Sequence, residues 1–148
     1  MSGLKKLAGA YMMLVAVVVA VFFIINTFLA DSLDVLSIWY VLDVLMLIGL
    51  ALALIYNYSR KSGVDGGDSG EGVTRGYLEA NVAFFVTAGV TILFLHNWFA
   101  LLANGSDYLG SSGSDGNHQS WVIWAAVDTV LPIVLGVTGC HLWKNASE

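Results

Sequence analysis

Four long apolar stretches separated by polar segments constrain most strongly what this chain can fold into. They cover residues 7–30, 38–58, 77–103 and 120–143. Each has the roughly 20 residues that an α-helix needs to cross a hydrocarbon layer about 30 Å thick. Only 11% of the residues are charged, whereas a soluble domain has about 25%. The sequence therefore predicts an all-α integral membrane protein, with a single domain of four transmembrane helices in an up-and-down bundle.

The positive charges predict the orientation of these helices. All the Lys and Arg residues precede the first stretch, separate the second from the third, or follow the last: Lys5, Lys6, Arg60, Lys61, Arg75 and Lys144. Cytoplasmic loops of membrane proteins are enriched in Lys and Arg. We therefore expect both termini in the cytoplasm, and the protein in the cytoplasmic (inner) membrane of a bacterium or an archaeon.

The connecting segments have different compositions. Segment 59–76 is rich in Gly, Ser and acidic residues and has no apolar anchor, which is typical of a flexible loop. Segment 104–119 is polar, rich in glycine and without basic residues, so it is expected to be an outer loop. The short Asp-Ser-Leu-Asp sequence at 31–34 offers an N-cap for the second helix or for a short interfacial helix.

Small residues four positions apart predict close contacts between helices. Gly49 and Ala53 form one such pair in the second stretch, and Gly136 and Cys140 form another in the fourth. This spacing lets the backbone of a neighbouring helix approach closely.

Several polar side chains interrupt the apolar stretches, all in the outer third of the predicted membrane layer: Asn26, Asp43, His96, Asn97 and Asp128. An ionised aspartate in hydrocarbon costs several kcal/mol, so Asp128 needs a partner, a proton or water. Pro132 lies four residues after Asp128 and has no N–H to donate to its carbonyl, so a helix kink is expected there. Inward-facing side chains at one level of a bundle can meet.

Two interpretations of this polar layer differ in their chemistry. Asp43, His96 and Asp128 are candidate ligands of a divalent metal, because carboxylate and imidazole suit Zn, Fe or Cu, and they are also candidates for a proton relay. The alternative is a structural network of hydrogen bonds that includes Asn26 and Asn97. The structural interpretation is favoured, because the chain lacks paired ligand spacings such as His-x-x-x-His. No cofactor is required by the sequence.

The composition favours a non-catalytic subunit that packs against and stabilises a larger membrane enzyme complex, such as an oxidoreductase or a metal-dependent monooxygenase. The chain has no water-soluble domain and too few polar residues for a complete active site, so we do not expect it to be an enzyme by itself. The alternative is a small membrane redox or metal-binding protein that uses Asp43, His96 and Asp128. A third possibility is a small proton-coupled transporter. Expected partners are membrane lipids and other integral-membrane subunits, and no nucleic acid.

Overall fold

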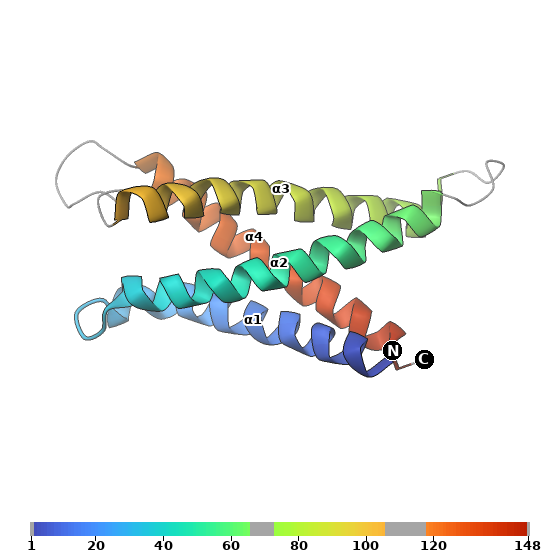
Figure 1. Cartoon of the computed structure of the whole chain (residues 1–148), viewed down its shortest axis with the longest axis horizontal. Helices are drawn as coiled ribbons and strands as arrows, with labels where there is room; N and C mark the ends of the chain where they lie inside the picture. Colours follow the sequence, from blue (N-terminus) through green and yellow to red (C-terminus); the bar gives the residue numbers. More distant parts are fainter. Residues whose placement is uncertain (1, 66–72, 106–117, 148) are drawn as a thin grey trace.

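The computed structural model describes residues 2–65, 73–105 and 118–147, which form four α-helices and no strand. The helices are α1 (Ser2–Leu29), α2 (Val35–Asp65), α3 (Arg75–Asn104) and α4 (His118–Asn145). Consecutive helices run in opposite directions (Figure 1). All four are long and apolar enough to cross a membrane. The predicted all-α class with four apolar helices is therefore confirmed.

The helices extend beyond the apolar stretches at several ends. In particular, α2 continues to Asp65, into the segment expected to be a flexible loop. Charged pairs stabilise this extension: Lys61 pairs with Asp65 one turn later, and Arg60 Nη2 lies 3.4 Å from Glu79 Oε2 of α3. Such pairs stabilise a helix beyond its apolar part. The length of the apolar stretch alone therefore underestimates the length of α2. The rest of that expected loop (66–72) and most of the expected outer loop (106–117) lie outside the described residues.

Side-chain caps begin two of the helices. At α2, the backbone N–H of Ser37 donates to Asp34 Oδ1 at 3.3 Å and the Ser37 hydroxyl donates to Oδ2 at 2.6 Å. These hydrogen bonds, that of the hydroxyl first, hold the pKa of the Asp34 carboxyl below its ordinary value. At α3, Thr74 Oγ1 accepts a hydrogen bond from the backbone N–H of Tyr77. The N-cap predicted before the second helix is confirmed.

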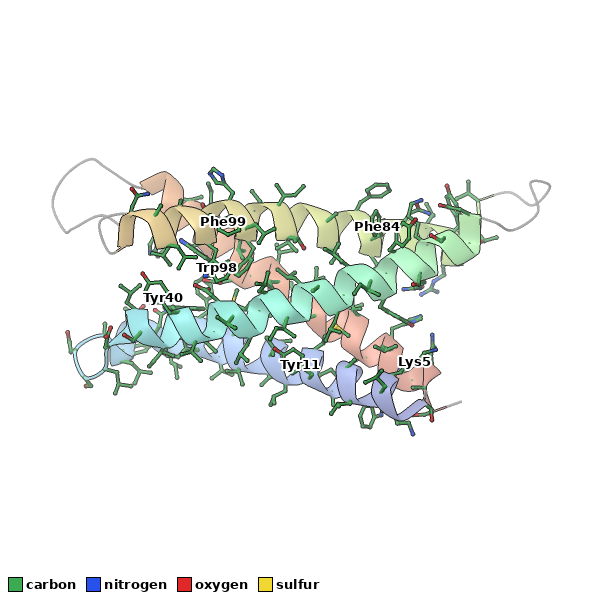
Figure 2. All side chains as sticks on the ribbon, viewed as in Figure 1. Lys5, Tyr11, Tyr40, Phe84, Trp98 and Phe99 are labelled. Carbon is green, nitrogen blue, oxygen red and sulfur yellow. The ribbon has the colours of Figure 1, made fainter. Side chains whose placement is uncertain are left out.

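The bundle has two chemically different ends. We call one the terminal end, because it contains the first turns of α1 and α3 and the last turns of α2 and α4 (Figure 1). All six Lys and Arg residues of the chain lie within the two helical turns nearest this end of their helices, and Figure 2 shows Lys5 there. The opposite end contains the turn between α1 and α2, the end of α3 and the beginning of α4.

Helix α4 runs diagonally across the bundle and makes its most extensive contact with α1 (Figure 1). At the closest point, a Cβ built on Gly9 would lie 2.9 Å from the Gly139 carbonyl oxygen, and one built on Gly139 would lie 2.8 Å from that of Gly9. Only glycine at both positions lets the two backbones touch.

The outcome for the small-residue pairs is mixed. A Cβ on Gly49 would lie 2.8 Å from Leu135 Cδ1 of α4, so the predicted close approach at Gly49 is confirmed. On α4, however, a Cβ on Gly136 would meet its nearest neighbour at an ordinary 3.8 Å, and Cys140 is exposed. The tightest contact lies at Gly139 instead. Gly136 and Cys140 also meet α1, at Ala16 and at Met13 Sδ, which lies 3.3 Å from Cys140 Sγ.

Buried and partly buried hydrogen bonds join neighbouring helices. Asn57 Nδ2 of α2 donates to Thr87 Oγ1 of α3 at 3.0 Å and to Thr138 Oγ1 of α4 at 3.1 Å. All three side chains are almost completely buried. The Tyr11 hydroxyl of α1 donates to the Leu45 carbonyl of α2 at 2.8 Å (Figure 2). Polar contacts of this kind fix how apolar helices are rotated relative to one another.

Candidate functional site

A cavity of about 520 Å³ lies at the opposite end of the bundle and is lined by residues of all four helices. Its wall is mostly apolar and aromatic, with a few polar side chains. The residues that matter for its chemistry are Asn26, Trp39, Asp43, Trp121, Trp124 and Asp128. Cavities of about 300–1,000 Å³ with an apolar wall and a few polar groups are typical of small-molecule sites.

Asp43 and Asp128 occupy equivalent positions in the wall of this cavity. Both α2 and α4 begin at the opposite end, and the two aspartates lie 8 and 10 residues after Val35 and His118, that is, about 12 and 15 Å along their helices. Cα–Cβ bonds in a helix tilt toward its N-terminus. Both side chains therefore lean toward the end of the bundle at which the cavity lies.

The two carboxyl groups are buried without compensation. Asp43 is 1% exposed and Asp128 is 5% exposed. Within the described part of the chain, neither oxygen of Asp43 nor Oδ1 of Asp128 has a hydrogen-bond partner, and the described residues that line the cavity include no Lys, Arg or His. The two groups line the same cavity, so they repel each other when both are ionised. Buried carboxyl groups in proteins are normally protonated unless they are paired or bound to a cation, so ionisation of this pair calls for an opposite charge.

Tryptophan side chains accompany both aspartates. Trp39 precedes Asp43 by four residues and Trp124 precedes Asp128 by four residues, so each indole lies on the same helix face as the carboxyl group. The ring of Trp39 packs edge-on against Phe22 of α1, and that of Trp124 packs edge-on against Phe94 of α3. These contacts hold the indoles in the cavity wall.

Buried apolar side chains lie deeper in the bundle than the two aspartates. Met46 and Leu50 follow Asp43 along α2, Leu131 follows Asp128 along α4, and all three are 0% exposed. They separate the aspartates from the hydrogen bonds of Asn57 nearer the terminal end. This deeper part of the bundle is therefore filled by apolar packing.

The structure brings together some of the residues that the sequence singled out. Asp43, Asp128 and Asn26 line the cavity. His96 is instead exposed on the side of α3 that faces away from the bundle. Its neighbour Asn97 is fully buried and does not line the cavity. Among the described residues, no group of three His, Cys, Asp or Glu side chains is arranged to hold a metal ion.

The helix around Pro132 is continuous, since α4 extends through it from His118 to Asn145. The kink expected there stays a prediction.

His141, the histidine of the terminal end, pairs with the Tyr56 hydroxyl at 2.7 Å and is far along α4 from the cavity.

The aromatic part of the site was not predicted from the sequence, although a pattern marks it. The sequence Trp-x-x-x-Asp occurs at 39–43 in α2 and again at 124–128 in α4, the two helices that start at the opposite end.

Comparison of the chain with protein-family models, curated proteins and solved structures gave no match.

Proposed function

We propose that this chain is an integral membrane protein that binds a cation in the cavity between Asp43 and Asp128. The observation that carries the proposal is a pair of buried carboxyl groups in one cavity wall. Both oxygens of Asp43 and Oδ1 of Asp128 have no hydrogen-bond partner among the described residues, and the described cavity lining contains no basic residue. A bound cation supplies the missing opposite charge. It also removes the repulsion between the two carboxylates.

The Coulomb attraction between a cation and the two carboxylates favours binding. A unit positive charge about 5 Å from one carboxylate is attracted by roughly 3 kcal/mol at an effective dielectric constant of about 20. Two carboxylates act in the same direction, and part of this energy offsets the dehydration of the cation. The apolar wall keeps water away and so keeps the field from being screened.

The direction of access follows from the charge distribution. All six Lys and Arg residues lie at the terminal end, and such clusters face the cytoplasm in membrane proteins. The proposal therefore places the terminal end in the cytoplasm of a bacterium or archaeon and the cavity on the outer side. The cation is taken up from outside.

The test compares wild type with Asp43→Asn and Asp128→Asn, singly and together. A ligand that binds only the folded protein raises its melting temperature. We expect at least one cation among Na⁺, Ca²⁺, Zn²⁺ and benzyltrimethylammonium to stabilise the wild type in lipid nanodiscs and to have no such effect on the double variant. Asp31→Asn removes an exposed charge near the same end and serves as the control, with wild-type behaviour expected. If no cation stabilises the wild type more than the double variant, the proposal is wrong.

The side of α3 that faces away from the bundle favours a second function. This function is that of an accessory subunit of a larger membrane complex. His96 is exposed on this face, and nothing lies within 4 Å of a Cβ built on Gly89 two turns earlier. Ionisable side chains within membrane helices almost always contact protein or water rather than lipid, and a glycine permits close approach of another helix. This face therefore suits a helix of a partner subunit.

Purification of the native assembly in a mild detergent tests the second function. We expect a defined partner in constant ratio to the chain, and we expect Gly89→Leu to release it while leaving the fold intact, because the added side chain meets open space. Val17→Leu on the exposed face of α1 is the matched control. Recovery of the chain alone from native membranes would contradict the subunit role.

A further inference from the structure

We infer that the cation bound between Asp43 and Asp128 is an organic ammonium ion that carries alkyl or aromatic groups. This inference rests on the proposed function and specifies its ligand. Its basis is the juxtaposition of two buried carboxyl groups with three indole rings in one cavity wall. The size of the cavity, its aromatic wall and its few ligand atoms each point to this class.

The first argument is size. The cavity has a volume of about 520 Å³, whereas a water molecule in liquid occupies about 30 Å³. An inorganic ion would leave most of this space to water, beside side chains that are mainly apolar. An ammonium ion with apolar substituents fills the volume and covers the wall, and it removes apolar surface from water.

The second argument is the aromatic wall. Trp39 and Trp124 lie one helical turn closer to the opening than Asp43 and Asp128, and Trp121, which is 63% exposed, lies at the mouth. Indole is the aromatic group that binds cations best, and aromatic walls are characteristic of sites for quaternary ammonium groups. A cation held by the carboxylates therefore has its substituents among the indoles.

The third argument is the small number of ligand atoms. Ca²⁺ takes six to eight oxygen ligands, and Zn²⁺ in proteins takes at least three side-chain ligands. In the described cavity wall the carboxylates of Asp43 and Asp128 are the charged ligands, and the side chains of Asn26 and Thr27, which also line it, are hydrogen-bonded to each other at 3.2 Å. Two carboxylates neutralise a charge but do not build a coordination shell. An alkylated ammonium ion needs no such shell.

The same chemistry has two sources, a soluble ammonium compound and the ammonium headgroup of a membrane lipid. Both present a cation with apolar substituents to an opening at the membrane surface. Lipid composition separates them, since phosphatidylglycerol has no ammonium group and phosphatidylcholine has one.

The experiment measures binding of radiolabelled benzyltrimethylammonium to the full chain in nanodiscs by equilibrium dialysis. In phosphatidylglycerol discs we expect saturable binding that is abolished in the Asp43→Asn/Asp128→Asn double variant and unaffected by an equal concentration of Na⁺ or Ca²⁺. Equal binding in phosphatidylcholine discs identifies a soluble ligand, and weaker binding there identifies the lipid headgroup as a competitor. Either result supports an ammonium site.

Tryptophan variants test the aromatic wall separately from the charge. Trp39→Leu and Trp121→Leu are each expected to weaken binding about 2- to 30-fold, the range of a cation–π contact, whereas Trp39→Phe restores most of it. Trp121 is the variant least able to disturb folding because its side chain is largely exposed. Trp143→Leu, at the terminal end, is the control and should bind as wild type does.

The outcomes distinguish failure of the inference from failure of the proposed function. Binding of Ca²⁺ or Zn²⁺ without binding of benzyltrimethylammonium would leave the cation site standing and overturn the organic ligand. Benzyltrimethylammonium binding that persists in the double aspartate variant would overturn the inference too, because the ion would then be held elsewhere. Absence of binding by every cation would overturn both.

Discussion

Replacing Gly139 by alanine tests whether the contact between α1 and α4 holds the bundle together. The new methyl group would lie 2.8 Å from the Gly9 carbonyl oxygen and 3.0 Å from Met13 Cγ. Real Cβ atoms essentially never approach a backbone oxygen so closely. The two helices must therefore separate, and the surrounding side chains must repack.

The magnitude follows from a comparison with Gly136→Ala, one turn earlier on the same helix. There the new methyl would meet Ala16 Cβ at 3.8 Å, an ordinary contact. Both substitutions gain the same helix propensity, about 1 kcal/mol, so this contribution cancels in the comparison. Overpacking costs about 1–3 kcal/mol. The unfolding free energy of Gly139→Ala should therefore be lower than that of Gly136→Ala by about 1–3 kcal/mol.

Reversible unfolding in mixed micelles, followed by tryptophan fluorescence, measures the two unfolding free energies. The comparison uses the same substitution in one helix, and circular dichroism confirms that both variants are equally helical before unfolding. Equal stability of the two variants would refute the reasoning. It would mean that the backbones of α1 and α4 are not in contact at Gly139.

Three further predictions concern other parts of the bundle. Asn57→Leu should lower the unfolding free energy by about 1–2 kcal/mol, because it removes two buried interhelical hydrogen bonds. Asn81→Leu is the control. It loses a hydrogen bond only within its own exposed turn, so its unfolding free energy should stay within about 0.5 kcal/mol of the wild-type value. The folded-state pKa of Asp34 is below its unfolded value, so its stabilising contribution is present above the unfolded pKa and is lost as the pH falls through the folded one. Thermal unfolding at a series of pH values should show this loss in the wild type and not in an Asp34→Ala variant. In a background without the native cysteine, an impermeant maleimide should label Ser32→Cys in intact cells and Ser62→Cys only after permeabilisation; the reverse pattern would overturn the proposed orientation.

The sequence predicts the number and class of the helices because these depend on local composition alone. A run of about 20 apolar residues can satisfy its backbone in a membrane only as a helix, whatever its neighbours are. The diagonal path of α4 is not local in this sense. It depends on contacts such as that between Gly9 and Gly139, residues at opposite ends of the chain. Nothing in either segment alone indicates the other.

The sequence predicts how deep each residue of the candidate site lies along its helix, but not how each helix is rotated about its own axis. The constant rise per residue places Asp43 and Asp128 at similar depths once the helices are identified. Which side chains of α3 face inward is a different question, because that helix is apolar on all sides and its pattern selects no face. Adjacent residues point about 100° apart, so His96 and Asn97 cannot both face the interior, and the structure buries Asn97.

The glycine contact between α1 and α4 also has a consequence for the order of assembly in the cell. Helix α1 is synthesised first, yet its most extensive contact is with the helix synthesised last. Until α4 has left the ribosome, buried side chains of α1 such as Met12, which lies beside Gly139, lack their native neighbours on α4. The contact between α1 and α4 therefore forms only after all four helices have been synthesised. A shortened chain without α4 would leave the buried face of α1 without its main partner.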